Sequence, residues 1–142
     1  MHVLLTRPLE DSIELIKRFK DKGLTVSHLP LIKINKLNHP KLNSLEYKII
    51  IFTSSNAIRN LDTKDFDKNI LCFCVGDATE KTAKQKGFHN TFSAGGNVRN
   101  LRELILQNLE KKTEKILYVS GELVSYDLDK DLVKEGLNVQ RI

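Results

Sequence analysis

Residues 49–56 read IIIFTSSN, and this stretch decides the fold. Its four apolar residues run together without the polar alternation of a half-exposed strand, and small polar residues follow at once. Residues 116–121 repeat the arrangement as ILYVSG. Continuous apolar runs of this length are typical of strands in a parallel sheet that helices cover on both faces. The sequence therefore predicts an α/β protein.

On both sides of this stretch, strand-like runs alternate with amphipathic helices. Asp77 and Glu80 have the spacing of a capping box at one helix start. The expected strands are Tyr47–Thr53, Ile70–Val75, Thr91–Ser93, Lys115–Val119 and Leu137–Ile142, and the expected helices are Ser54–Leu61, Asp77–Lys86, Asn97–Glu110 and Val124–Glu135. This alternation predicts a complete flavodoxin-like domain over residues 47–142, with a doubly wound parallel sheet of five strands.

The first 34 residues contain one strand–helix–strand unit, with strands at Val3–Thr6 and Leu24–Ile34 around a helix at Leu9–Lys22. The helix carries an apolar stripe, Leu9, Ile13, Ile16 and Phe19. One such unit cannot bury both faces of its sheet. We therefore expect residues 1–34 to begin a second, similar domain that is completed by strands from elsewhere. Residues 35–46 interrupt all periodicity and are interpreted as a linker.

The composition is that of an ordinary globular protein, with 40% hydrophobic and 29% charged residues. No apolar run approaches the roughly 20 residues of a membrane span, and no signal-peptide pattern precedes the first strand. We expect a cytoplasmic protein without a membrane partner. The formal net charge is +5, but lysines alternate with acids, as in residues 17–22. That pattern indicates solvated helix faces and argues against a nucleic-acid partner.

Two cysteines, Cys72 and Cys74, lie two residues apart in an expected strand and so point to the same face. They are interpreted as apolar core packing. A metal site would need at least two further ligands nearby, and the four scattered histidines supply none. No metal is expected.

Chemistry is expected where the strands end, because ligands of open parallel sheets bind beyond the carboxyl ends of the strands. The five strand-end turns are small, hydroxylic or rich in glycine: Thr6–Pro8, Thr53–Asn56, Gly76–Thr79, Ser93–Asn97 and Ser120–Glu122. Free backbone N–H groups at helix starts favour carboxylates or phosphates. Ser, Thr, Asp and Asn are also ordinary helix caps, which is the alternative for any single turn. Five such turns on one edge predict a binding cleft.

Several nucleotide-binding and catalytic patterns are absent from the sequence. No Gly-x-Gly-x-x-Gly follows a strand, and no P-loop pattern exists. A phosphate-receiving response domain would need acidic residues where Thr6 and Thr53 stand. No histidine lies in a strand-end turn, so a Ser/His/Asp set is excluded. Catalysis here would depend on positioning and hydrogen bonding.

The order of these segments resembles that of the uroporphyrinogen-III synthase family. The matching segments are residues 3–8 (VLLTRP), 30–32 (PLI), 50–57 (IIFTSSNA), 75–79 (VGDAT) with Gly87-Phe88, and 116–121 (ILYVSG). The resemblance implies an enzyme that closes the linear tetrapyrrole hydroxymethylbilane into uroporphyrinogen III. The reaction eliminates water, inverts the last pyrrole ring and uses no cofactor.

The resemblance also implies a substrate-binding set and assigns no acid, base or nucleophile. Thr53, Ser54, Ser55 and Asn56 would grip substrate carboxylates. The same side would be lined by Gly76, Thr79, Ser93, Gly95, Ser120 and Gly121. Thr6 and Arg7 would face these residues from the other domain, although Arg7 also reads as a surface residue before Pro8.

The family has two similar domains joined by a two-stranded connector, and this sequence stops at Ile142, about where the connector should return. The chain is therefore expected to be a fragment with feeble or no activity alone, or to recruit a second copy. In that case residues 1–34 would fray or pair in a domain-swapped homodimer. The alternative function is a noncatalytic module that binds small anions or another protein, since fold does not fix function.

Overall fold

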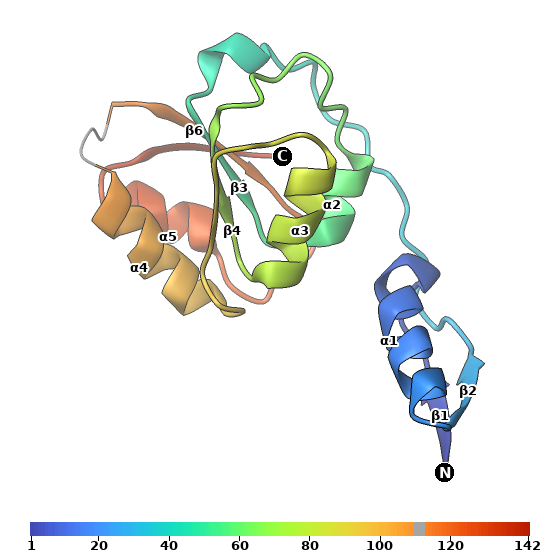
Figure 1. The fold of residues 1–142 in the computed structure, drawn as a ribbon. Coiled ribbons are helices and arrows are strands. Elements are labelled where there is room, and N and C mark those ends of the chain that lie inside the picture. The colour runs from blue at the N-terminus through green and yellow to red at the C-terminus, as the bar shows by residue number, and fades with distance from the viewer. Residues whose placement is uncertain (110–112) are drawn as a thin grey trace. The chain divides into compact units, whose positions relative to one another are not determined.

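The computed structural model describes residues 1–109 and 113–142 (Figure 1). The chain divides into two compact units, Met1–Asn38 and His39–Ile142. We call them the N-terminal unit and the C-terminal unit, and each is described by itself. None of the helices in the described ranges combines the length and the apolar character that crossing a membrane requires.

The N-terminal unit is one strand–helix–strand motif. Strand β1 (His2–Leu5) pairs in parallel with β2 (Thr25–His28), and helix α1 (Leu9–Asp21) connects them. Gly23, at φ 75°, makes the turn after the helix, a left-handed conformation that glycine adopts without strain. Strand β2 is shorter than the predicted Leu24–Ile34, although Leu29 N and Leu31 N still donate to the carbonyl oxygens of Leu5 and Thr6 beyond its end.

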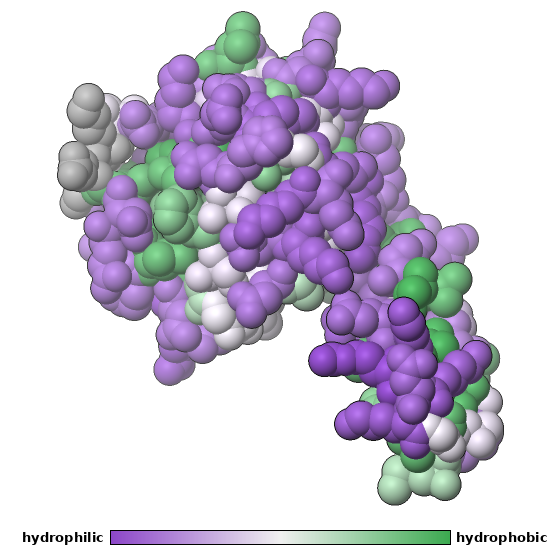
Figure 2. Space-filling model, viewed as in Figure 1, coloured by the Kyte–Doolittle hydropathy of each residue, from purple (hydrophilic) through white to green (hydrophobic). Residues whose placement is uncertain are grey.

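Little of the N-terminal unit is buried. Ser12 is the one residue of this unit, which is described throughout, that is fully buried. The apolar side chains of Leu4, Leu9, Ile13 and Leu31 are each more than half exposed, and hydrophobic atoms reach the surface of this unit in Figure 2. The motif therefore has elements of regular secondary structure without a core of its own.

The C-terminal unit contains a parallel sheet of five strands in the order β5-β4-β3-β6-β7. The strands are β3 (Ile49–Phe52), β4 (Leu71–Cys74), β5 (Thr91–Ser93), β6 (Lys115–Val119) and β7 (Asn138–Arg141). Every residue of β3 is fully buried, as the continuous apolar run predicts. The predicted class, an α/β fold with a five-stranded parallel sheet, is confirmed.

The order of the strands differs in one respect from the flavodoxin-like arrangement that we predicted. Counted from β3, the order is 3-2-1-4-5, whereas a flavodoxin has the order 2-1-3-4-5. Both orders arise from the same alternation of strands and helices, so the sequence pattern cannot distinguish them. The order of the strands reverses between β3 and β6, which are parallel neighbours at the centre of the sheet.

Helices cover both faces of this sheet, so it is doubly wound (Figure 1). On one face lie α2 (Ser55–Asn60) and α3 (Asp77–Gln85), packed through Ile58 and Ala83. On the other face lie α4 (Val98–Asn108) and α5 (Leu128–Lys134). A short 3-10 helix, Ser44–Glu46, precedes the sheet within the predicted linker. The predicted end of the α4 helix at Glu110 lies outside the described residues.

One predicted capping box and one predicted helix start are wrong, whereas α3 begins at Asp77 as predicted. Asp77 and Glu80 form no capping box, because α3 begins after Gly76 and Glu80 instead accepts a hydrogen bond from Thr91 Oγ1 at 2.8 Å. Helix α5 begins at Leu128 and not at Val124, since Asp127 has non-helical dihedral angles. The residues between β6 and α5 are therefore a longer loop than the sequence predicted.

The cysteines lie in the core, as predicted. Cys72 and Cys74 are fully buried on the α2–α3 face, with their sulfur atoms 3.8 Å apart. The neighbouring Cys74 thiol and the burial both raise the pKa of Cys72. Within residues 1–109 and 113–142, no group of three or more His, Cys, Asp or Glu side chains is arranged to hold a metal ion. The thiols therefore act as small apolar side chains.

Candidate functional site at the carboxyl edge of the sheet

Four of the five predicted turns lie on one edge of the C-terminal sheet. The turns that begin at Thr53, Gly76, Ser93 and Ser120 follow β3, β4, β5 and β6, and all of these strands run parallel. Parallel strands bring their carboxyl ends to the same edge. The fifth turn, Thr6–Pro8, follows β1 in the N-terminal unit and is described separately.

Near the point where the strand order reverses, a row of paired residues crosses the sheet, and polar side chains lie on its face. The ladders pair Ile51 with Tyr118, and Tyr118 with Arg141. Thr53 and Ser120 each lie two residues beyond a member of this row, so they share its face. The Thr53 hydroxyl lies 3.2 Å from the phenol oxygen of Tyr118, which is itself 1% exposed. This row is the centre of the candidate site.

Arg141 holds the turn after β6. Its Nε donates to Ser120 Oγ at 2.7 Å, and its Nη2 donates to the carbonyl oxygens of Gly121 and Glu122 at 2.9 and 3.0 Å. The backbone adds two bonds, from Ser120 N to the Ile142 carbonyl and from Ile142 N to the Tyr118 carbonyl. The ends of β6 and β7 are therefore joined by both main chain and side chain.

The turn after β3 is partly engaged in starting helix α2. The Ser54 hydroxyl accepts a hydrogen bond from Asn56 N at 3.2 Å, which makes Ser54 the N-cap. The Ser55 hydroxyl donates to the Ala78 carbonyl at 3.3 Å, and the Asn56 carbonyl group of the side chain accepts from Arg59 at 2.9 Å. Capping explains Ser54, whereas Thr53 is directed to Tyr118.

Close packing of the turn after β4 against the turn after β5 requires glycine at Gly76. A Cβ atom on Gly76 would come within 3.1 Å of Gly96 Cα, so the two backbones touch. The Gly96 N–H donates to the Val75 carbonyl at 2.7 Å. Thr79, in the first turn of α3, is 6% exposed. The structure thus brings Gly76 and Gly96 together and places Thr79 largely inside.

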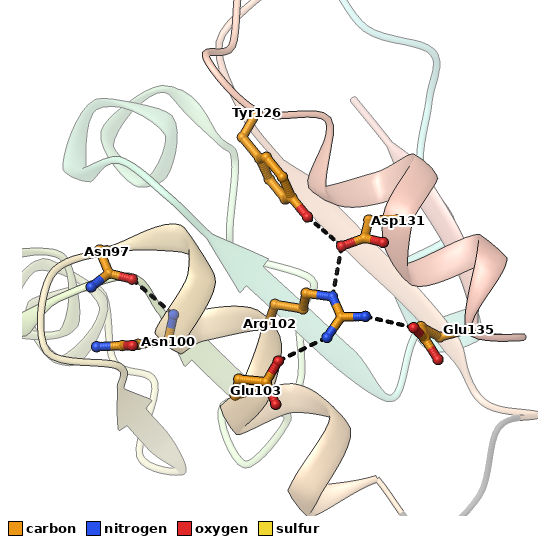
Figure 3. Close-up of polar contacts among 7 residues, drawn as sticks. All are labelled: Asn97, Asn100, Arg102, Glu103, Tyr126, Asp131 and Glu135. Carbon is orange, nitrogen blue, oxygen red and sulfur yellow. Dashed lines mark hydrogen bonds and ion pairs between the residues drawn. The ribbon is translucent and has the colours of Figure 1, made fainter.

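The turn after β5 contacts an acid at the start of α3. The Ser93 hydroxyl donates to Asp77 Oδ1 at 2.6 Å and accepts from Gly95 N at 3.4 Å. Asn97 caps α4 by accepting from Asn100 N at 2.8 Å (Figure 3). The exposed carboxylate of Asp77 therefore stands between the ends of β4 and β5, and would repel an anion placed next to it.

The two predicted site residues of the N-terminal unit lie after β1. The Thr6 carbonyl accepts a hydrogen bond from Leu31 N at 2.9 Å, and the Arg7 carbonyl accepts from a His28 ring nitrogen at 2.8 Å. The Arg7 side chain is exposed. These bonds hold the turn through its main chain and leave the Arg7 guanidinium directed to solvent.

A hollow of about 430 Å³ lies beside the β6 turn, lined by residues 124–127 with Lys130, Asp131 and Lys134. Behind it, Arg102 of α4 binds carboxylates on three sides: Asp131 at 2.6 Å, Glu135 at 2.5 Å and Glu103 at 2.8 Å (Figure 3). The Tyr126 hydroxyl donates to Asp131. The bonds from Tyr126 and Arg102 lower the pKa of Asp131, and the bond to Asp131 raises the pKa of Tyr126.

Sequence reasoning missed two residues of this edge, Tyr118 and Arg141. Tyr118 was counted as an apolar strand residue, and Arg141 as the end of the last strand. A signal existed for Arg141, because it ends a strand on the same edge as the four turns. Apart from the Asp77 carboxylate, the arrangement offers neutral hydroxyls, backbone amides and a guanidinium. Such groups bind and orient a carboxylate-bearing molecule, and none of them is a strong general base.

The chain is similar to proteins of one biosynthetic family. The family described as uroporphyrinogen-III synthase HemD matches this chain over residues 13–142. The porphyrin biosynthesis protein HemD of Ruminiclostridium josui is 28% identical over 156 residues, a match that covers 99% of this chain and 31% of that protein.

Two solved structures share the fold. The uroporphyrinogen-III synthetase from Helicobacter pylori 26695 has a TM-score of 0.59 and 22% identity, over 82% of this chain and 53% of that chain. The Thermus thermophilus uroporphyrinogen III synthase has a TM-score of 0.54 and 15% identity, over 100% and 61%. The chain therefore spans between about a third and three-fifths of the length of these relatives.

Proposed function

Because the chain belongs to the uroporphyrinogen-III synthase family, as its motifs predicted, we propose that it acts in tetrapyrrole biosynthesis. The reaction is the closure of hydroxymethylbilane to uroporphyrinogen III, with loss of water and inversion of the last pyrrole ring. The observation that supports this most strongly is the family match over residues 13–142. No cofactor enters the proposal.

The carboxyl edge of the C-terminal sheet is the proposed substrate surface. Substrate carboxylates would be held by Thr53, Ser54, Ser55 and Asn56, and the same side would be lined by Gly76, Thr79, Ser93, Gly95, Ser120 and Gly121. Thr6 and Arg7 would contribute from the N-terminal unit. A flexible bilane that is held in one conformation reacts faster because its ends are already oriented. The net charge of +5 favours the approach of a polyanion.

The test is to incubate the chain with hydroxymethylbilane and to separate the isomers I and III of the product. Isomer I is the product expected without the enzyme, so isomer III above the no-protein control supports the proposal. Thr53→Ala should weaken substrate binding by about 0.5–1.5 kcal/mol, the value of one neutral hydrogen bond. Isomer I alone, combined with tight binding of the bilane, would instead support a noncatalytic binding module.

We also propose that the N-terminal unit pairs with another polypeptide, in the simplest case a second copy of this chain in a swapped homodimer. Its exposed Leu4, Leu9 and Ile13 and its two-stranded sheet favour such pairing. Light scattering should then report a mass that rises with concentration. A monomer with fully protected β1 amides would contradict the pairing. Within the cell, the cytoplasm is the proposed location, and no nucleic-acid partner is proposed.

A further inference from the structure

Arg141 and Arg102 are both partly buried arginines of the C-terminal unit, but their partners differ in charge. Arg102 is surrounded by the carboxylates of Asp131, Glu103 and Glu135. Arg141 donates to one hydroxyl and two carbonyl oxygens, all of them neutral. The positive charge of Arg102 is therefore neutralised by its own fold. No carboxylate of residues 1–109 and 113–142 forms an ion pair with Arg141, and its charge adds to the hydrogen bond from Lys130 in lowering the pKa of Asp127.

One nitrogen of Arg141 has no partner among residues 1–109 and 113–142. Its Nε and Nη2 are used by the turn after β6, while Nη1 makes no hydrogen bond to any residue in the described part of the chain. Nη1 is also not among the buried unsatisfied atoms there, so it reaches solvent. The nearby carboxylate of Asp127 is engaged by Lys130 at 2.8 Å. Arg141 thus presents a fixed, open N–H donor group.

The position of this donor group fits a ligand site. Arg141 lies in register with Tyr118, next to the point where the strand order reverses, and open α/β sheets bind their ligands there. Three hydrogen bonds already fix the guanidinium, so little side-chain freedom would be lost on binding. A guanidinium of this kind prefers carboxylate or phosphate oxygens.

We infer that Arg141 binds a peripheral carboxylate of the tetrapyrrole through Nη1, and that its neutral partners in the 120–122 turn exist to hold it for that contact. The inference rests on the proposed function, which supplies a polycarboxylate as the ligand. It adds a positively charged contact on the β6–β7 side of the edge, away from the Asp77 carboxylate between β4 and β5.

The test is a fluorescence titration of the whole chain with uroporphyrin III, the stable oxidised form of the proposed product. Arg141→Gln should weaken binding about tenfold or more, as expected for the loss of one charge-assisted hydrogen bond. The affinity of Arg141→Lys should lie between those of the unmodified chain and Arg141→Gln, because lysine keeps the positive charge and lacks the planar guanidinium. Lys48→Gln is the matched control: it removes one charge next to the opposite, amino end of β3, and affinity should stay within about twofold of the unmodified chain.

Equal affinities for Arg141→Gln and Lys48→Gln would overturn the role of Arg141 and leave the proposed function standing. No binding of uroporphyrin by the unmodified chain would overturn both. If Arg141→Gln fails to fold, the NMR signal of the Arg141 Nε–H in the unmodified chain replaces the variant. It should shift during the titration, and a stationary signal in the presence of bound uroporphyrin would overturn the inference.

Discussion

The two units begin with the same strand–helix–strand motif and differ in what covers it. In the C-terminal unit, β3, α2 and β4 enclose Ile50, Ile58 and Cys72, each fully buried. In the N-terminal unit, β1, α1 and β2 leave Leu9 and Ile13 52% and 58% exposed. The motif alone therefore specifies helices and strands, whereas a core requires further strands and a second helical layer.

Helices α1 and α4 show the same difference. Both carry an apolar stripe. Leu101 and Ile105 of α4 are fully buried against a sheet of five strands. The stripe of α1 has a sheet of two strands to pack against, and Leu9 and Ile13 stay exposed. Amphipathic spacing records which face a helix would bury, and it does not supply the surface that buries it.

The largest effect is expected when the two units are separated. Residues 39–142 should unfold in one cooperative transition close to that of the whole chain, because all buried hydrophobic residues of the described chain lie from Tyr47 to Leu137. Residues 1–38 alone should show no cooperative transition in thermal circular dichroism. A cooperative transition of residues 1–38 as a monomer would show that the N-terminal unit has a core of its own.

A matched pair of substitutions sharpens the comparison. Ile116→Ala, at a fully buried position of β6, should lower the free energy of unfolding by about 2–5 kcal/mol. Ile13→Ala, at an exposed position of α1, should change it by less than about 0.5 kcal/mol at concentrations so low that the chain is monomeric. Urea titration of both variants measures this. A large cost of Ile13→Ala would indicate that another polypeptide covers the stripe.

The sequence was sufficient for the elements and their class because the apolar runs at residues 49–52 and 116–119 are unambiguous. It was insufficient for the strand order, which depends on how helices cross the sheet. It also failed at Glu80, where a tertiary hydrogen bond from Thr91 replaced the expected local cap. Local spacing reports local preferences, and long-range partners override them.

The candidate site shows the same division. Ser54 and Asn97 were identifiable from sequence as polar residues at helix starts, and both are caps. The link between Thr53 and Tyr118 spans 65 positions, and it depends on the register of β3 against β6. No local pattern encodes that register, so the polar row required coordinates.

Glycines in the two units should differ more moderately. Gly76→Ala places Cβ 3.1 Å from Gly96 Cα and should cost about 1–3 kcal/mol, since neither backbone has room to move freely. Gly23→Ala meets no atom within 4 Å, but its φ of 75° is unfavourable for alanine by about 1–2 kcal/mol. Urea unfolding of the C-terminal unit should report the first cost and not the second. A shift of that transition by Gly23→Ala would show that the two units unfold together.

The smallest expected effect is on the way in which stability depends on pH. The bonds from Tyr126 and Arg102 hold the pKa of Asp131 below its ordinary value of 3.8. A lowered pKa in the folded state means that the carboxylate stabilises the fold above about pH 4, and that this contribution is lost as the pH falls through the lowered pKa. Asp131→Asn should lower the melting temperature at pH 7 and lose that difference towards pH 3. A difference that does not change with pH would contradict the account.

The most direct test of the central claim is a ¹⁵N NMR titration of the whole chain with hydroxymethylbilane. The account predicts shifts in the amides of residues 53–56 and 118–122, and in the side chain of Arg141. The amides at the opposite edge, around Lys48, Leu71 and Asn138, should stay in place. Shifts that concentrate on the opposite edge, or on neither, would contradict a substrate surface at the carboxyl ends of these strands.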